Sequence, residues 1–380
     1  MGMNELRQEI DRIDEQMIRL FAERMDVATR IGQYKKENNL PVLDLSREKE
    51  KILNVIDQSP EHLKEFTPLL FSLLFEISRN QQSRLCGLDG EIASAIKKSI
   101  ETTPQIFPDN VSVACQGIAG ANSQAACEKL FRYPRTFFCS SFEAVFSAIE
   151  NGLCAYGVIP LENSSAGSVN LVYDQMMRRH FYIVRSIRLK ISHNLLVKPG
   201  VKLENIREIY SHEQALNQCS VYLSKLKNVR VIPCENTAVA AKMVAESDRD
   251  DIAAIASEQC IKQYGLNCLE ESIQNVDNNY TRFICIAKNL EIYPGANRTS
   301  LMMTLPHEQG SLFKVLSKFY SLGINLNKLE SRPLPNKEFE FMFYFDLDTP
   351  VYSPNLLQVI EELKTSCDFF QYLGSYSEVI

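Results

Sequence analysis

Two cations lie on the apolar face of a predicted N-terminal helix. Apolar residues recur at three- and four-residue intervals from residue 4 to about residue 38, where Pro41 follows, and this pattern predicts one long helix. At 100° per residue, Ile13, Ile31 and Lys35 all fall within about 20° of Arg24 around this helix. A buried cation without an anion costs several kcal/mol, so this face predicts bound negative charge.

The next two predicted helices also carry polar groups where apolar residues are expected. In the second helix, Glu48 lies on the apolar face, with Arg47 beside it. In the third helix, Ser78 and Gln82 are one turn apart and share an edge. These groups either pair with one another, as Arg24 would with Glu48, or they line a pocket for a small dianion inside a helical bundle.

The spacing of these polar residues resembles that of the all-helical chorismate mutases. The resemblance covers essentially the whole first block and implies an intertwined homodimer. Arg7 lies about 25 Å along the helix from Arg24, so it serves a neighbouring chain's pocket more easily than its own. The implied substrate contacts are Arg7, Arg24, Lys35, Asp44, Arg47, Glu48, Ser78 and Gln82.

The chemistry of such a mutase accounts for these residue types. Chorismate carries two carboxylates, which the planar guanidinium groups of Arg7 and Arg24 can bind. The rearrangement to prephenate is unimolecular, so the resemblance implies no cofactor and no metal, only a pocket that holds the compact conformer. Lys35 and Gln82 would stabilise the charge that grows on the ether oxygen, and Glu48 would accept a hydrogen bond from the substrate hydroxyl.

Four polar clusters follow in the middle of the chain, next to predicted strands. They are 117–123 with a Gly-x-x-Gly pattern, 160–168 with Glu-Asn-Ser-Ser-Ala-Gly-Ser, Ser211-His212-Glu213-Gln214, and Thr281-Arg282-Phe283. Each cluster alone is typical of a turn or a helix start. Because ligands of α/β folds bind at the carboxyl ends of strands, the four together predict an anion-binding cleft.

Taken in this order, the four clusters resemble prephenate dehydratase over residues 110–290, most specifically in 156–168 and in 281–283. The resemblance implies two α/β lobes, like those of periplasmic binding proteins, with a cleft between them. It places the catalytic roles on Glu162, Asn163, Ser211, Gln218 and Thr281. Two residues depart from the family's pattern, Glu213 and Asn122, and both concern substrate contacts more than the type of reaction.

The dehydratase reaction needs a proton donor, because hydroxide leaves prephenate together with carbon dioxide and is a poor leaving group. The resemblance makes Thr281 the essential residue, but a neutral hydroxyl is a feeble acid. We therefore expect Thr281 to position the leaving group or relay a proton, and Glu162, if burial raises its pKa, to be the acid. Arg282 is either a clamp for a substrate carboxylate or the partner of a structural ion pair.

The C-terminal block, residues 298–380, predicts the order strand, helix, strand, strand, helix, strand of the ferredoxin-like fold. Gly310-Ser311-Leu312 and Glu330-Ser331-Arg332-Pro333 resemble the regulatory ACT domain of the same enzyme family, which implies phenylalanine as an effector. The alternative is a plain dimerisation domain. The expected effector contacts are Gly310, Ser311, Leu312, Glu330, Ser331 and Arg332.

The elements that must position these residues form three blocks. We expect an all-α helical bundle over 1–90, a two-lobed α/β domain over 110–290, and an α+β ferredoxin-like domain over 298–380, with a linker near 99–110. The second helix is expected after Asp44 or Ser46, and the third begins at Thr67-Pro68. A helix of roughly 50 Å outruns one small core, which again indicates a bundle shared between chains.

The composition excludes several classes of protein. The 380 residues are 45% hydrophobic and 23% charged with a net charge of −6, which argues against nonspecific nucleic-acid binding. The N-terminus lacks an apolar signal core, and no apolar stretch is long enough to cross a membrane. Eleven cysteines without a CxxC pair and five histidines without an HExxH motif predict no metal site and a reducing, cytoplasmic location.

The resemblances together imply a bifunctional enzyme that converts chorismate to prephenate and prephenate to phenylpyruvate, and that phenylalanine inhibits. A homodimer or higher homo-oligomer is expected. One alternative is an enzyme that prefers arogenate, the amino form of the substrate. A second alternative is a non-enzymatic sensor, against which the set Arg24, Lys35, Glu48, Gln82 and Thr281 argues.

Overall fold

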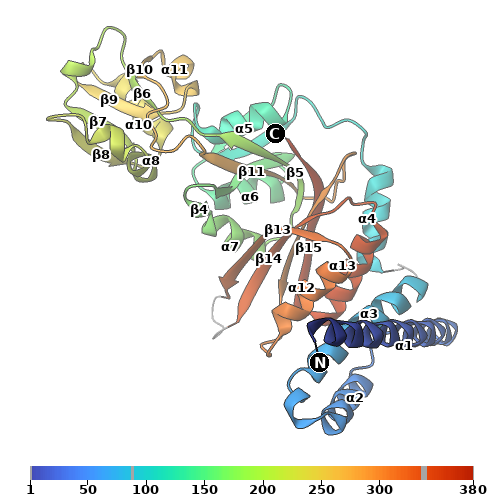
Figure 1. Ribbon diagram of the computed structural model, residues 1–380. Helices are drawn as coiled ribbons and strands as arrows, with labels where there is room; N and C mark the ends of the chain where they lie inside the picture. The colour runs from blue at the N-terminus through green and yellow to red at the C-terminus, as the bar shows by residue number, and fades with distance from the viewer. Residues whose placement is uncertain (1, 87–89, 335–339, 380) are drawn as a thin grey trace. The chain divides into compact units, whose positions relative to one another are not determined.

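The structure is a computed structural model that describes residues 2–86, 90–334 and 340–379 (Figure 1). The chain forms two compact units. The first unit comprises Met1–Ala95 and Met303–Gln371, and the second comprises Ile96–Met302 and Tyr372–Ile380. Compact units and functional domains need not coincide, so the three domain ranges expected from the sequence stay a prediction.

Three helices begin the first unit, as the apolar periodicity predicts. They are α1 (Met3–Glu37), α2 (Leu45–Gln58) and α3 (Thr67–Cys86), with a short 3₁₀ turn η1 (Glu61–Leu63) before α3. The side chain of Asp44 accepts the backbone N–H of Arg47 at 3.0 Å and so caps α2. Both expected bounds of α1 and the expected starts of α2 and α3 are confirmed to within two residues.

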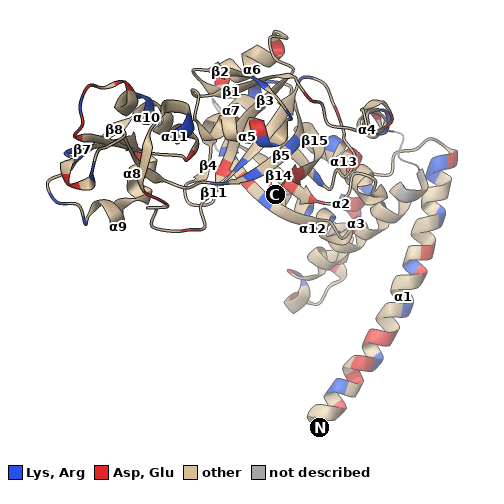
Figure 2. Ribbon diagram, turned by 90° about the horizontal axis from the view of Figure 1, so that it is seen from above, with Lys and Arg blue, Asp and Glu red and all other residues tan. Residues whose placement is uncertain are grey.

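Helix α1 contacts α3 through small residues in its C-terminal half. Ala28 and Gly32 are its buried residues, and a Cβ atom on Gly32 would lie 3.1 Å from the Cα of Gln82. Toward its N-terminus α1 leaves its apolar stripe in solvent, with Ile13 and Met17 about half exposed. Basic and acidic residues are interspersed along this helix (Figure 2).

The C-terminal block of the chain follows the predicted order of elements. The elements are β12 (Arg298–Thr304), α12 (Ser311–Ser321), β13 (Asn325–Pro333), β14 (Phe341–Asp348), α13 (Pro354–Ser366) and β15 (Phe369–Val379). Strands β13 and β14 pair antiparallel, with Glu330 opposite Tyr344 and Arg332 opposite Met342. Strand β13 is an edge strand of its sheet.

The second unit contains two mixed sheets. The larger sheet runs in the order β12-β15-β5-β11-β3-β1-β2, with β4 paired to β3, and the smaller in the order β10-β6-β9-β7-β8. Their strands are β1 (Ser112–Gln116), β2 (Arg135–Cys139), β3 (Tyr156–Asn163), β4 (Gly167–Ser168), β5 (Tyr182–Lys190), β6 (Asn194–Val197), β7 (Glu208–His212), β8 (Arg230–Cys234), β9 (Ile252–Ala256), β10 (Asn267–Glu270) and β11 (Tyr280–Ala287).

Helices cover these sheets and bury their apolar side chains. Figure 1 shows α8, α10 and α11 grouped with the smaller sheet. The helices of this unit are α5 (Asn122–Leu130), α6 (Phe142–Glu150), α7 (Asn170–Arg178), α8 (Glu213–Gln218), α9 (Ser220–Leu223), α10 (Thr237–Glu246) and α11 (Gln259–Tyr264), with the 3₁₀ turn η2 (Leu203–Asn205). Each sheet has its own apolar core, so the two lobes expected for the middle block are present.

One sequence expectation about the connections is wrong. The segment 99–110 was expected to be a linker, but its first residues belong to helix α4 (Glu91–Thr102). Ser99 is buried and donates to the carbonyl of Leu290 at 3.0 Å, and Thr103 accepts the N–H of Ile292 at 3.1 Å. These bonds hold residues 99–103 in the second unit, so the extended connection begins only after Thr103.

Across the described ranges, no helix is long and apolar enough to cross a membrane. The same ranges contain no group of three or more His, Cys, Asp or Glu residues that could hold a metal ion.

Candidate active sites

The first site lies where β3 ends and β11 begins. These strands are antiparallel, so the last residues of β3 face the first of β11, with Asn163 opposite Thr281 and Glu162 opposite Arg282. We expected Thr281 at the carboxyl end of a strand; instead the antiparallel direction brings the start of β11 to that edge. The register shifts directly after Arg282, and such bulges often re-aim side chains at functional sites.

A continuous set of amide hydrogen bonds runs from Thr281 into the smaller lobe. Asn163 Nδ2 donates to Thr281 Oγ1 at 2.9 Å and to Asn279 Oδ1 at 2.8 Å. Asn279 Nδ2 donates to Gln218 Oε1 at 3.1 Å, and His193 Nε2 lies 2.8 Å from the same oxygen. The structure therefore brings together three of the predicted catalytic residues, Asn163, Gln218 and Thr281, through one intermediate amide.

Asn279 and His193 are functional candidates that the sequence analysis missed. Burial lowers the pKa of His193, and its hydrogen bond to Gln218 opposes this effect only in part. The ring is therefore neutral near neutral pH and donates from Nε2 to Gln218. The Asn278-Asn279 pair, separated from Thr281 by Tyr280 alone, is a signal that could have indicated Asn279, whereas nothing in the sequence singles out His193.

A cavity of about 540 Å³ adjoins this network. Its walls come from the loop after β3, from α8 and the residue before it, and from the loop that leads into β11. Amide side chains dominate the lining, which comprises Ser165, Ala166, His212, Glu213, Gln214, Asn217, Gln218, Gln274, Asn275, Val276 and Asn279. Glu213, one of the two departures from the family pattern, lines the cavity, while Asn122 does not.

Ser211 does not line this cavity. Its side chain is fully buried in the smaller sheet, and its hydroxyl donates to the carbonyl of Ile255 at 2.5 Å. The next residue, His212, caps α8 by accepting the N–H of Gln214 at 3.3 Å. The catalytic role expected for Ser211 stays a prediction, and its observed contact joins two strands of the sheet.

Arg282 belongs to a buried ion cluster. Its guanidinium lies 3.4 Å from Glu162 Oε1 and 3.1 Å from Glu378 Oε1, and it donates to the Tyr376 hydroxyl at 2.9 Å. Of the two roles left open by the sequence, this geometry is that of the structural ion pair. Glu162 is about 29% exposed, so the burial that an acid role requires is incomplete.

The second site is built around α3 of the first unit. Arg24 donates to the carbonyl of Leu74 at 3.0 Å and to the hydroxyl of Ser78, and burial lowers the pKa of Arg24. Lys35 donates to the carbonyl of Val42 at 2.6 Å. Gln82 is buried against Gly32, and its Oε1 atom has no hydrogen-bond partner among the described residues.

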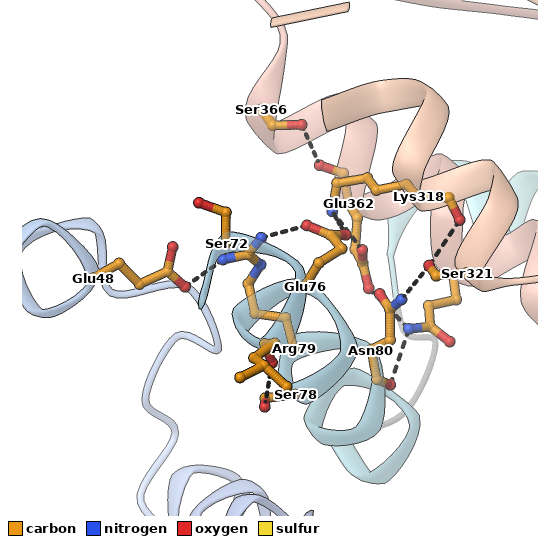
Figure 3. Close-up of polar contacts among 12 residues, drawn as sticks. Glu48, Ser72, Glu76, Ser78, Arg79, Asn80, Lys318, Ser321, Glu362 and Ser366 are labelled. Atoms are coloured by element: carbon orange, nitrogen blue, oxygen red, sulfur yellow. Dashed lines mark hydrogen bonds and ion pairs between the residues drawn. The ribbon is translucent and has the colours of Figure 1, made fainter. Parts of the chain in front are cut away.

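The remaining residues predicted for this site have separate surroundings. Glu48 accepts a hydrogen bond from Arg79, so the pairing of Arg24 with Glu48 that the sequence left open is absent from the contacts of the described side chains (Figure 3). Arg47 is exposed and pairs with Glu50 at 2.9 Å. Arg7 and Asp44 are exposed.

The expected effector residues lie at the start of α12 and along β13. Gly310 is the N-cap of α12 with a φ of 81°, a conformation that favours glycine, and Ser311 and Leu312 begin the helix. Glu330, Ser331 and Arg332 follow one another on the edge strand β13.

The comparisons with known proteins match the two regions of the chain that contain these candidate sites. The family model "Chorismate mutase type II" matches residues 6–83, and the family model "Prephenate dehydratase" matches residues 113–291. The bifunctional chorismate mutase/prephenate dehydratase of Aquifex aeolicus is 34% identical over 380 residues, which cover 100% of this chain and 98% of that protein. Arogenate dehydratase/prephenate dehydratase 2 of Arabidopsis thaliana is 40% identical over 281 residues, covering 70% of this chain and 72% of that protein.

A solved structure extends the comparison to the fold. The prephenate dehydratase of Arthrobacter aurescens, solved in complex with L-Phe, has a TM-score of 0.64 and 27% identity, covering 70% of this chain and 90% of that one. The sites and the fold thus define an enzyme with a chorismate mutase region and a prephenate dehydratase region in one chain. The chain belongs to the family of bifunctional chorismate mutase/prephenate dehydratases, which act in phenylalanine biosynthesis.

Proposed function

We propose that the chain converts chorismate to prephenate at the helical site, converts prephenate to phenylpyruvate at the 540 Å³ cavity, and is inhibited by phenylalanine through its C-terminal block. The observation that carries this proposal is the hydrogen bond between Asn163 and Thr281 beside an amide-lined cavity, in a chain that matches bifunctional relatives over its whole length.

In the mutase reaction, the side chains act as fixed charges and dipoles. Arg24 binds one substrate carboxylate, and Arg7 of a second copy binds the other. Lys35 and Gln82 donate to the ether oxygen, where negative charge grows as the C–O bond breaks and the new C–C bond forms. Glu48 accepts a hydrogen bond from the substrate hydroxyl.

In the dehydratase reaction, the bond to the ring carboxylate breaks and releases carbon dioxide. The freed electron pair enters the ring, and the ring C–OH bond breaks as the ring becomes aromatic. The leaving hydroxide takes a proton and departs as water, so the site must hold a donor at that oxygen. Thr281, fixed by Asn163, places its hydroxyl there, while Asn279 and Gln218 hold the other side of the cavity.

Arogenate is a second candidate substrate for the same cavity. It carries an ammonium group where prephenate carries a keto oxygen, and Glu213 supplies a carboxylate to the cavity lining. The 40% identical Arabidopsis relative is named for both substrates. A comparison of kcat/KM for the two substrates decides between them, and Glu213→Gln is expected to weaken arogenate turnover more than prephenate turnover.

We propose a regulatory ACT domain for the C-terminal block. Its support is the strand-helix-strand-strand-helix-strand order, the left-handed Gly310 at the start of α12, and the L-Phe complex of the Arthrobacter relative. Inhibition requires that phenylalanine bind one conformation of the enzyme better than another. The exchange Gly310→Ala strains the αL turn and is expected to reduce phenylalanine sensitivity without changing basal turnover.

We further propose a homodimer formed through α1, in the cytoplasm. The exposed apolar residues of this helix form a stripe that a second copy would cover, namely Leu6, Ile10, Ile13, Met17, Phe21 and Ile31. Pairing of two such helices would also bring Arg7 of one chain toward the site of the other. A charge introduced by Met17→Glu is expected to give monomers in light scattering and to abolish mutase activity.

A two-stage assay tests the whole proposal. The purified chain is given chorismate and, separately, prephenate, and phenylpyruvate is measured with and without phenylalanine. Formation from both substrates, suppressed by phenylalanine, is the expected result. Prephenate that accumulates without phenylpyruvate would indicate arogenate specificity in the second step. Binding of phenylalanine without any turnover would favour the non-enzymatic sensor and overturn the proposal.

A further inference from the structure

Five charged side chains form a continuous chain in the first unit. Glu48 of α2 pairs with Arg79 of α3, and Arg79 also pairs with Glu76, one turn earlier on α3. Glu76 Oε1 lies 2.8 Å from the ammonium of Lys318 on α12, and Lys318 lies 2.8 Å from Glu362 on α13. Figure 3 shows these groups meeting from four helices.

Negative and positive groups alternate along this series of five side chains, and the central ones are buried. Glu76 and Lys318 are about 5% and 8% exposed, so each needs its partners to offset the loss of hydration. Burial lowers the pKa of Arg79, but Glu76 and Glu48 more than offset this effect, and the net pKa is raised. Arg79 is thus shared between a buried carboxylate and the more exposed Glu48.

Neutral side chains fix the same helices in place. Gln358 Nε2 donates to Glu362 Oε1 at 2.9 Å and to the carbonyl of Asn80 at 3.0 Å. Asn80 Nδ2 donates to the hydroxyl of Ser321 at 2.8 Å. Residues of α3 are therefore held by α12 and α13 at several points beside the ion pairs.

We propose that Lys318 and Glu76 are positioning residues of the mutase reaction, which act on Glu48 through Arg79. The inference rests on the proposed role of Glu48 as acceptor of the substrate hydroxyl. Lys318 neutralises Glu76, so Arg79 is available to Glu48. Without Lys318, Glu76 would be balanced by Arg79 alone and would draw the guanidinium away from Glu48. The mutase site would then depend on a residue of the C-terminal block, 270 positions further along the chain than Glu48.

The test uses the full chain and measures both reactions in each preparation. Lys318→Met is expected to lower kcat/KM for chorismate by about tenfold and to leave prephenate turnover unchanged. Lys318→Arg keeps the charge and is expected to restore most of the mutase rate. Lys314→Met removes an exposed lysine one turn earlier on the same helix and is the matched control.

Two double variants separate positioning from simple loss of structure. In Lys318→Met/Glu76→Gln both buried charges are absent, so Arg79 returns to Glu48 and the mutase rate is expected to recover. In Lys318→Met/Glu48→Gln the second change is expected to add little, because both act on one group. Recovery in the first and non-additivity in the second support the inference even where Lys318→Met alone folds poorly.

The outcomes separate the proposed role of Glu48 from the positioning role of Lys318 and Glu76. An unchanged mutase rate in Glu48→Gln would show that the proposed role of Glu48 is wrong. A large loss in Glu48→Gln together with full activity in Lys318→Met would overturn the positioning role alone. The same conclusion would follow if the loss in Lys318→Met persisted in the Glu76→Gln background, since the effect would then be structural.

Discussion

Asn163 donates from Nδ2 to the Thr281 hydroxyl at 2.9 Å, while its Oδ1 accepts the backbone N–H groups of Ser165 and Ala166. The two N–H donors fix which end of the amide faces Thr281. The threonine oxygen is therefore an acceptor toward Asn163, and its own proton remains to be donated. This arrangement turns an ordinary hydroxyl into an oriented donor, which is what a leaving hydroxide requires.

The variant Thr281→Val removes this donor and keeps the shape of the side chain. We expect kcat for phenylpyruvate formation to fall by about a hundredfold or more, because one oriented donor at a developing charge is lost. Thr281→Ser keeps the hydroxyl and is expected to retain most of the rate. Chorismate consumption by the same preparations is the control, and equal loss in both Thr281 variants would contradict the argument.

The exchange Asn163→Asp tests the orientation of the threonine hydroxyl. A carboxylate can still accept the N–H groups of Ser165 and Ala166, but it cannot donate to Thr281 or Asn279. The hydroxyl of Thr281 would then donate to the new carboxylate instead of to the substrate. We expect an unchanged melting temperature with a large loss of dehydratase kcat, and a loss confined to KM would count against this reading.

Glu162→Gln decides whether Glu162 is the proton donor. An amide can still accept from Arg282 but cannot supply a proton, so an acid role predicts a fall in kcat of about a hundredfold. The pairing with Arg282 suggests instead that Glu162 holds this guanidinium in place. Full dehydratase turnover in Glu162→Gln would show that Glu162 is not the acid, and would leave Thr281 as the group that hydrogen-bonds the leaving oxygen or relays a proton to it.

The features of the fold that depend on local sequence patterns could be predicted from the sequence. Helices α1 to α3 follow from apolar spacing and from the signals at Asp44 and Pro68, and the order of elements in the C-terminal block was also correct. The sequence could not predict which groups pair between elements. Arg79 rather than Arg24 binds Glu48, and His193 reaches Gln218, because such pairings depend on how elements pack and not on local spacing.

The sequence also could not predict to which side of a strand an individual residue points. Ser211 and His212 are neighbours in the sequence, but successive side chains of a strand point to opposite faces. Ser211 therefore points into the sheet, and His212 borders the cavity. The helical start of the segment 99–110 was missed because its two prolines, Pro104 and Pro108, which are typical of a linker, both follow the end of α4.

The exchange Gly32→Ala is expected to lower mutase activity more than it lowers the stability of the fold. The added Cβ would meet Gln82 Cα at 3.1 Å and Leu85 Cδ1 at 3.2 Å. Overpacking costs about 1–3 kcal/mol, whereas alanine gains about 1 kcal/mol over glycine inside a helix. The two terms nearly cancel in stability, but the displaced Gln82 no longer reaches the ether oxygen.

The measurement for Gly32→Ala is mutase kcat beside the melting temperature. A several-fold lower kcat with a small change in melting temperature is expected, and dehydratase turnover is expected to stay constant. Gly2→Ala, where an added Cβ meets nothing within 4 Å, is the control on the same helix. A Gly32→Ala enzyme with normal mutase kcat would show that the contact between α1 and α3 does not set the position of Gln82.

The buried His193 predicts how stability changes with pH. Burial lowers the pKa of His193 in the folded chain, while in the unfolded chain it titrates near 6.5. Below that value the unfolded state binds the proton more readily, so folding stability falls as the pH drops from about 6.5 toward the lowered pKa. We expect the melting temperature of His193→Gln to decline less over this window than that of the unaltered chain.

His180→Gln, which alters an exposed histidine of the same unit, is expected to leave the decline unchanged. Parallel curves for all three proteins would mean that His193 carries its proton equally well in both states, and that the neutral ring proposed beside Gln218 is wrong.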